Sequence, residues 1–334
     1  MTKFRNSLLF ILLFFFINSF FCKLLAPDKL ASDLIVRPYF KDTNQYDVVS
    51  LGSSHIYCGI NIDVLEQETG LSAYNLSHSS QKIVQSYFLL KESIEQEKIP
   101  KLIILDLFEL IRSGKFEKYD LGYNQIYKTY QGLQSESIKK EYKEVMNFKP
   151  YPLELSNIHN NWKNLSFSNL KINLGFEKSQ MSEEKVYKGF YSTEEKIRKE
   201  DLEFLIKGVN FDKIPHYFPI TEINDLEFYY LKKIIDISED NNIKVLLIKT
   251  PVLNYIYQSE EYINKNYLPL RKKISKLNIN YIDFNDTNNL SKLELNYLED
   301  FKDNGHLNIN GSTKLTKYLI PVINSYEIKK DTVK

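Results

Sequence analysis

Short apolar runs alternate with longer amphipathic stretches along the chain, and this alternation predicts buried strands that are connected by helices. The first short apolar run after the N-terminal segment, residues 47–51, leads into the Gly-Ser-Ser sequence at 52–54, which is typical of a strand that enters a tight turn. A weakly amphipathic helix is expected over about 62–68, where Gly70 would end it, and residues 72–76 can form a second strand. The expected order is therefore strand, helix, strand.

The next segments extend this order. A helix with apolar side chains at every third or fourth position is expected over about 81–96, and the hydroxyls of Ser79 and Ser80 can cap its first turn. After Pro100, the run 101–108 is apolar on both faces. Strands of this kind, alternating with helices, are typical of a parallel sheet that helices cover on both sides.

The same alternation returns in the last third of the chain. Helices are expected over about 223–240 and 260–277, and strands over 243–248 and 280–284. A final helix begins near Asn310. The whole pattern predicts an α/β protein with three layers, α/β/α, around a mainly parallel sheet.

The middle of the chain, about 112–219, lacks this regularity. Charged helical pieces alternate there with loops rich in proline, asparagine and aromatic residues. We interpret the segment as a long helical and irregular insertion, or cap, on the sheet and not as a separate catalytic domain. Its aromatic side chains could stack on sugar rings, although packing in a core is their more common role.

The N-terminus has the features of a membrane-targeting segment. Lys3 and Arg5 precede an almost uninterrupted apolar run over 8–22. The segment is either a cleaved signal peptide or an uncleaved signal anchor. We favour the anchor, because cleavage after Ala26 would leave Pro27 immediately downstream, which signal peptidases process poorly.

The charges around this run predict its orientation. Positively charged flanks stay in the cytoplasm, so the rest of the chain would lie outside. The remaining sequence has no comparable apolar stretch. We therefore expect a single-pass protein of the cytoplasmic membrane, with an anchor at 1–27 and an extracytoplasmic domain at 28–334 that carries the insertion.

Composition excludes several classes of protein. The 334 residues include 44 lysines and arginines and 43 aspartates and glutamates, a formal net charge of +1, so we expect no nucleic-acid partner. Two cysteines cannot form a disulfide framework or a cysteine-based zinc site. No group of histidines and acids has the spacing of metal ligands, so neither a metal nor another cofactor is expected.

The candidate chemistry lies near the two ends of the predicted α/β pattern along the chain. Ser54 would be exposed where a strand ends and a helix begins, which is where open α/β sheets bind ligands. A serine hydroxyl needs a base, and His306 follows Asp303 by three residues, a spacing at which the carboxylate can orient the imidazole. Each signal alone is also ordinary turn chemistry, whereas together they suggest a Ser54–His306–Asp303 triad.

Read in order, these motifs resemble the SGNH (GDSL-type) hydrolase superfamily, and in particular its membrane-anchored branch of acyltransferase- and esterase-like proteins in bacterial cell envelopes. The resemblance covers about 46–108 and 243–320 and leaves out the insertion. It implies a flavodoxin-like fold in which Ser54 is the nucleophile, His306 the base and Asp303 its partner. The matching segments are Leu51-Gly52-Ser53-Ser54-His55, Ala73-Tyr74-Asn75-Leu76, Ser79-Ser80-Gln81 and Asp303 to Gly311.

The sequence departs from the superfamily pattern at the oxyanion donors. Ser80 stands where a glycine is usual, although its backbone N–H can still donate. The Gly-x-Asn-Asp block that usually follows the third strand is missing, because the chain continues Asp-Leu-Phe-Glu over 106–109. One of the usual hydrogen-bond donors to the oxyanion therefore has no counterpart in the sequence pattern. Asn75, Gln81 or a group from the insertion are the candidates to replace it.

The resemblance also implies a function. Relatives take part in polysaccharide O-acetylation and teichoic-acid D-alanylation, often beside a multi-pass membrane-bound O-acyltransferase. This implies acyl transfer through an acyl-Ser54 intermediate, with O-acetylation or deacetylation of a cell-surface glycan or its lipid-linked precursor, and a membrane O-acyltransferase as acyl donor. The alternatives are a catalytically weak accessory or glycan-binding protein that keeps the fold, and a secreted esterase or lipase.

Other reactive side chains have simpler expectations. We expect His55 to pack or to form hydrogen bonds beside Ser54, and Cys58 to be a buried small apolar residue. His78 follows the second predicted strand and could face the site. His159 and His216 lie in the insertion and are expected at the surface.

Overall fold

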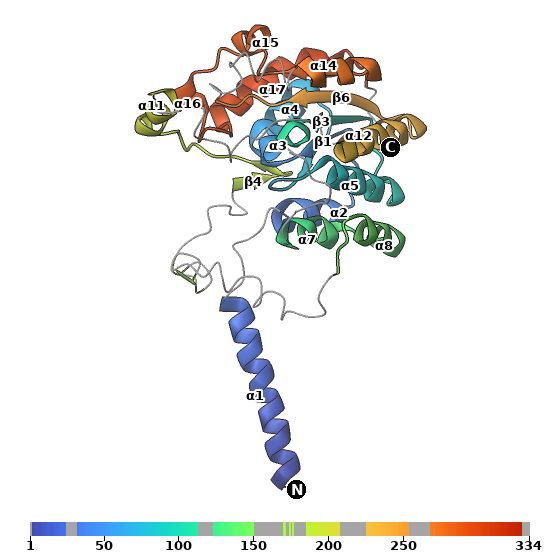
Figure 1. Ribbon diagram of the computed structural model, residues 1–334, viewed down its shortest axis with the longest axis vertical. Helices are drawn as coiled ribbons and strands as arrows, with labels where there is room; N and C mark the ends of the chain where they lie inside the picture. The colour runs from blue at the N-terminus through green and yellow to red at the C-terminus, as the bar shows by residue number, and fades with distance from the viewer. Residues whose placement is uncertain are drawn as a thin grey trace.

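The computed structural model is built around a buried parallel sheet (Figure 1). The described residues are 2–24, 32–112, 123–149, 170, 171, 174, 176, 185–207, 225–253 and 268–328. Five parallel strands lie in the order β2-β1-β3-β6-β7. Their bounds are β1 Val48–Gly52, β2 Ala73–Ser77, β3 Leu102–Asp106, β6 Lys244–Lys249 and β7 Asn280–Asp283.

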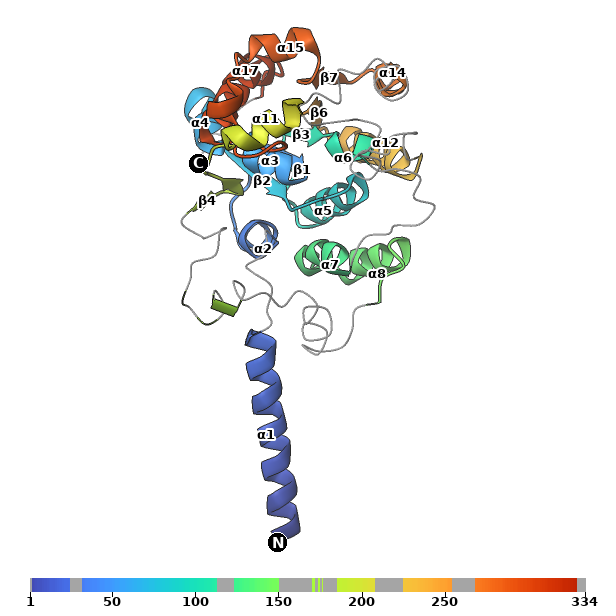
Figure 2. The same ribbon diagram turned by 60° about the vertical axis from the view of Figure 1, so that its left-hand side comes forward.

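Helices cover both faces of this sheet, because its central strands are apolar on both sides. Alternate residues of β3 belong to different cores: Ile103 and Leu105 to one, Leu102 and Ile104 to the other. The first face carries α5 (Ile83–Glu95), α12 (Asp225–Asp240) and α14 (Leu268–Ile274), and the second carries α4 (Ile62–Thr69) and α17 (Ile309–Asn324). Figure 2 shows the sheet between these two helix layers. The predicted α/β class with a parallel sheet is confirmed.

The N-terminal apolar run forms the helix α1, Thr2–Leu24, which projects away from the sheet domain in both views (Figures 1 and 2). The segment Phe4–Phe21 is apolar on average and long enough to cross a membrane, and its large apolar side chains are exposed. At about 1.5 Å per residue, 23 residues span about 35 Å, more than the hydrocarbon thickness of a bilayer. The helix is a candidate membrane anchor or signal sequence.

A small group of helices packs against the core on the α5 side of the sheet. The π-helical turn Ser32–Val36 and α2 (Arg37–Lys41) pack beside α7 (Tyr123–Gly132). Together with α8 (Glu136–Val145), α7 contacts α5. Two of the predicted insertion's helices are therefore part of the main core.

The hairpin formed by β4 (Val186–Tyr187) and β5 (Phe190–Tyr191) covers the outer edge of the sheet. The backbone N–H of Asn75 in β2 donates to the carbonyl of Lys188 at 3.0 Å. The turn needs Gly189, because φ is +79° there and a Cβ would lie 2.1 Å from the carbonyl oxygen of Asn75. The hairpin thus satisfies one backbone donor of the edge strand β2, which would otherwise be open to another strand.

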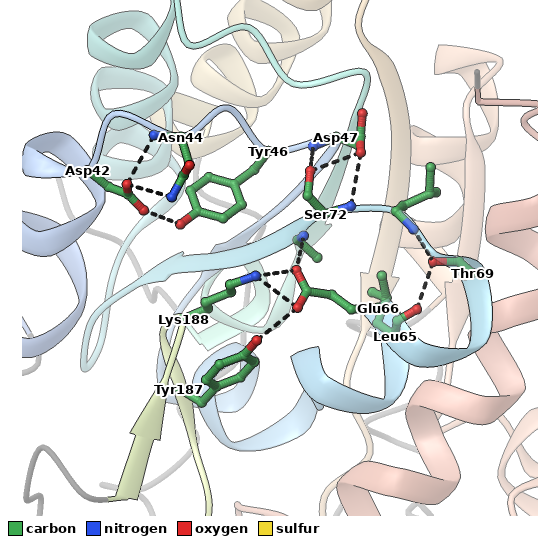
Figure 3. A network of polar contacts seen from close by, with 12 residues as sticks. Asp42, Asn44, Tyr46, Asp47, Leu65, Glu66, Thr69, Ser72, Tyr187 and Lys188 are labelled. Carbon is green, nitrogen blue, oxygen red and sulfur yellow. Dashed lines mark hydrogen bonds and ion pairs between the residues drawn. The ribbon is translucent and has the colours of Figure 1, made fainter. Parts of the chain in front are cut away.

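A polar network holds the hairpin in place (Figure 3). The Lys188 ammonium donates to both oxygens of Glu66, at 2.7 and 2.9 Å, and the Tyr187 hydroxyl donates to the same carboxylate. Glu66 also accepts from the backbone N–H of Ala73 at the start of β2. Nearby, Asp47 accepts from the N–H and the hydroxyl of Ser72. One carboxylate of α4 therefore joins the hairpin to β2.

Several predicted boundaries were wrong. Ser79 and Ser80 do not cap α5: the chain makes an additional turn after β2, with φ of +56° at Ser80, and the cap residue is Lys82. The side chain of Gln85 accepts from the N–H of Lys82 at 2.9 Å. The short helices α3 (Ser54–Gly59) and α6 (Phe108–Arg112) were not predicted, because each is too short to show a periodicity. The division of the chain into an anchor, a domain and an insertion stays a prediction.

The close approach at Gly189 gives a testable prediction for stability. Gly189→Ala should lower the free energy of unfolding by on the order of 2 kcal/mol, because a side chain there is strained in φ and collides with the backbone of β2. Urea unfolding of the full chain in detergent, followed by circular dichroism, measures this. Gly59→Ala is the matched control: its Cβ would come no closer than 3.6 Å to a neighbour, so it should change stability by less than about 1 kcal/mol. Equal effects of the two variants would contradict the role of Gly189.

Candidate active site

Ser54 is the first residue of the short helix α3, which follows β1 without a loop. The turn depends on Gly52, where φ is +150° and a Cβ would lie 2.8 Å from Ile56 and 2.9 Å from Asp106. Ser53 makes no side-chain cap, so it leaves the first-turn N–H groups of α3 without a capping hydroxyl. The side chain of Ser54 is partly exposed at the carboxyl end of the sheet.

His306 and Asp303 lie in the loop between α16 (Tyr297–Asp300) and α17. The His306 Nδ1 lies 2.9 Å from Oδ1 and 3.0 Å from Oδ2 of Asp303. Its Nε2 lies 2.7 Å from the hydroxyl oxygen of Ser54. When Nδ1–H donates to the carboxylate, Nε2 carries the lone pair that accepts the serine proton. The structure therefore brings Ser54, His306 and Asp303 together in one chain of hydrogen bonds.

The loop that carries the histidine is fixed from several sides. Asp303 Oδ1 accepts from the backbone N–H groups of Gly305 and His306, at 2.8 and 2.9 Å. The Leu253 N–H, beyond the end of β6, donates to the carbonyl of Asn304 at 3.0 Å. The backbone N–H of Lys302 donates to the carbonyl of His306. These bonds hold the carboxylate and the imidazole in one relative orientation.

The electrostatics of the pair favour a charged Asp303. Partial burial opposes its ionisation, but the hydrogen bonds and the charge of His306 outweigh burial and lower the pKa of Asp303 to about 2. The carboxylate is therefore ionised at neutral pH. The side chains of His306 and Asp303 are 25% and 42% exposed, so a substrate can reach them.

His55 packs directly against the histidine of this group. Its ring stacks on the ring of His306, with centroids 4.8 Å apart, and on Phe108 at 3.7 Å. Its Nδ1 lies 3.0 Å from the Ser53 hydroxyl. His55 thus both packs and forms a hydrogen bond beside Ser54.

His78 does not take part in this group of side chains. It is fully buried, with Nε2 2.7 Å from the Thr129 hydroxyl of α7 and Nδ1 3.2 Å from the carbonyl of Ser79. Burial, and then the charge of Lys128, lower the pKa of His78 to about 3, so the ring is neutral. His159 and His216 lie outside the described residues.

The three tentative oxyanion or binding residues have different environments. The Asn75 amide nitrogen donates to the carbonyl of Ile60 at 2.9 Å, and the Gln81 amide nitrogen donates to the Ser86 hydroxyl at 2.9 Å. Both side chains are buried and their amide donors are engaged inside the fold. Ser80 lies partly exposed in the turn after β2.

Tyr57 is a neighbour of Ser54 that was missed from the sequence. Its hydroxyl lies 3.0 Å from that of Ser79. The signal was the spacing: residues three apart on a helix lie on the same face. Cys58, the next residue, is buried, and burial raises the pKa of its thiol to about 12, so it is not a thiolate.

The neighbouring strand ends carry buried ionisable side chains. Asp106, at the end of β3, accepts from the Thr250 N–H at 3.2 Å, and burial raises the pKa of Asp106 to about 7. Lys249 and Asp283 end β6 and β7, with 4.0 Å between the ammonium and the carboxylate. Within the described ranges, no three histidines, cysteines or acids are grouped so that they could hold a metal ion.

Fold and site together define an α/β protein with a hydrogen-bonded serine–histidine–aspartate group at the carboxyl end of its sheet. The chain belongs to the family described as "Protein of unknown function (DUF1574)", whose model matches residues 6–322. No curated protein matches the chain. Among solved structures, it is similar to a "putative acylhydrolase" from Bacteroides fragilis NCTC 9343, with 11% identity, a TM-score of 0.40, and coverage of 86% of this chain and 94% of the other.

The buried acid Asp106 gives a prediction for pH dependence. Burial raises the pKa of Asp106 in the folded protein to about 7, whereas the ordinary pKa of an aspartate is 3.8. Between these values the unfolded chain binds fewer protons, so this group makes stability fall as pH rises. The free energy of unfolding of Asp106→Asn minus that of the wild type should therefore be larger at pH 8 than at pH 5. Urea unfolding at both pH values measures this difference.

The control for this experiment is Asp236→Asn, which changes an exposed acid of α12. The difference in the free energy of unfolding between this variant and the wild type should be the same at pH 5 and at pH 8. A difference between wild type and Asp106→Asn that does not change with pH would contradict the raised pKa.

Proposed function

We propose that the protein is an SGNH-like serine acyl-transfer enzyme, anchored in the cytoplasmic membrane by α1 with its sheet domain outside. The observation that carries the proposal is the hydrogen-bond chain from Asp303 through His306 to Ser54, joined across 252 residues of sequence. The order of the motifs along the chain, which resembles the superfamily, supports the same assignment.

The reaction begins with attack of the Ser54 oxygen on an acyl carbonyl carbon. His306 Nε2 takes the serine proton as the new C–O bond forms, and Asp303 stabilises the resulting imidazolium. When the tetrahedral intermediate collapses, His306 gives the proton to the departing alcohol oxygen. This leaves an acyl-Ser54 ester and a neutral histidine.

A second hydroxyl completes the cycle. Water or a sugar hydroxyl loses its proton to His306 Nε2 and attacks the acyl-Ser54 carbonyl, and the Ser54 oxygen recovers the proton as it leaves. Water gives an esterase and a sugar hydroxyl gives a transferase. An enzyme tethered at the membrane can meet a lipid-linked glycan and a membrane-bound O-acyltransferase that supplies the acyl group, and this favours transfer of an acetyl group to a cell-surface polysaccharide.

Labelling with a fluorophosphonate tests the activated serine. The full chain in detergent should form an adduct on Ser54, located by peptide mass spectrometry, because the base at 2.7 Å makes the hydroxyl nucleophilic. Ser54→Ala and His306→Ala should abolish labelling. Ser53→Ala, whose hydroxyl bonds to His55, is the matched control and should still be labelled at Ser54. A folded wild-type protein without an adduct would remove the catalytic assignment and favour the accessory or glycan-binding alternative.

Cysteine labelling tests the topology. In a Cys22→Ser background, Lys317→Cys places a thiol on the exposed face of α17, whereas the native Cys58 is buried. A membrane-impermeant maleimide should label Lys317→Cys in intact cells, because the positive flank of α1 stays in the cytoplasm. The Cys22→Ser parent is the control for background labelling. Labelling that requires lysis of the cells would reverse the proposed orientation.

A further inference from the structure

The proposed reaction places a negative charge on the carbonyl oxygen of the tetrahedral intermediate, and this charge needs hydrogen-bond donors. The Ser54 and Ser80 N–H groups provide two donors by analogy with the superfamily. The usual third donor, an asparagine after the third strand, is missing, because β3 continues into α6 with the sequence Phe-Glu-Leu-Ile-Arg over 108–112. The amide nitrogens of Asn75 and Gln81 are already engaged in buried hydrogen bonds.

The Tyr57 hydroxyl lies beside the turn that carries the Ser80 N–H. Tyr57 follows Ser54 by three residues on α3, so the two side chains lie on the same side of this helix. The Tyr57 hydroxyl lies 3.0 Å from that of Ser79, in the turn after β2. Tyr57 therefore joins α3, which begins at Ser54, to the turn that carries the Ser80 N–H.

The ring of Tyr57 is held in this position by packing. It is buried, and Tyr191 of β5 packs against it edge to face, with ring centroids 6.4 Å apart. Tyr191 belongs to the hairpin that Lys188 ties to Glu66. Burial raises the pKa of the Tyr57 hydroxyl above its usual range, so the group keeps its proton and is a donor at neutral pH.

We propose that Tyr57 is a catalytic residue whose hydroxyl donates a hydrogen bond to the oxyanion of the tetrahedral intermediate, in place of the missing asparagine. This inference rests on the proposed function. When Ser54 attacks, the carbonyl π electrons move to oxygen and the serine proton moves to His306. Tyr57 keeps its own proton throughout and donates a hydrogen bond that strengthens as the charge develops. The Ser79 hydroxyl can donate to the Tyr57 oxygen and so direct the phenolic proton toward the oxyanion.

The rate at which a fluorophosphonate modifies Ser54 tests this role, because the phosphonyl oxygen gains charge as the Ser54 O–P bond forms and fluoride leaves. In the full chain in detergent, Tyr57→Phe should lower the maximal rate by about 100-fold or more, the usual effect of losing one oxyanion donor. The probe concentration at half-maximal rate should stay the same, because the interaction strengthens only in the transition state. A loss of packing alone would not lower the maximal rate while leaving the probe concentration at half-maximal rate unchanged.

Two further variants complete the experiment. Tyr74→Phe is the matched control: it also removes the hydroxyl of a buried tyrosine, one that donates to the carbonyl of Ile35, and it should react at the wild-type rate. Ser79→Ala keeps the Tyr57 ring and removes the group that orients its proton, so it should slow labelling by a smaller factor. If Tyr57→Phe lowers the thermal unfolding temperature, the labelling rate of Ser79→Ala still tests the role of the Tyr57 hydroxyl.

The outcomes separate the two proposals. Wild-type labelling at Ser54 together with unchanged rates in Tyr57→Phe and Ser79→Ala would overturn the role of Tyr57 and leave the proposed function standing. If Tyr57→Phe does not fold, an unchanged rate in Ser79→Ala overturns the role by itself. Absence of any adduct on Ser54 in the folded wild-type protein would overturn both.

Discussion

Burial of both faces of one parallel sheet is the constraint on which the rest of the structure depends. Because every strand runs in the same direction, the carboxyl ends of all five strands meet at one edge, and each connection must return across a face. Ser54 follows the end of β1, and the loop of Asp303 and His306 reaches the same edge just before α17. The sheet thus brings together residues that are 252 positions apart in sequence.

The parts that the sequence predicted are those that depend on strong periodicity and on motif order. The apolar runs located all five strands of the sheet, and the spacing of Asp303 and His306 suggested the pair before its geometry was known. The environment of Tyr57 could not be predicted, because α3 has only six residues and its partner Tyr191 comes from the insertion, far along the chain. Contacts between such distant segments leave no local signal.

The hairpin β4–β5 connects the stability of the sheet edge with the geometry of the site. Its turn closes against β2 at Asn75, and the ion pair of Lys188 with Glu66 fixes it to α4 (Figure 3). Its second strand then presents Tyr191 to the ring of Tyr57. A segment that interrupts the α/β pattern in the sequence therefore supplies a packing surface for the first helix of the site.

Placing the third oxyanion donor on α3 has a consequence for the end of β3. In the proposed arrangement, the nucleophile and the phenol belong to one helical turn, so their relative position is set by helix geometry and not by the packing of a separate strand. The end of β3 is then released from the requirement for an asparagine. Its acids instead hold other elements: Asp106 accepts from Thr250 beyond β6, and Glu109 pairs with Lys82 at 2.6 Å at the start of α5. In this proposal, the Tyr57 hydroxyl takes the role that the superfamily pattern gives to that asparagine.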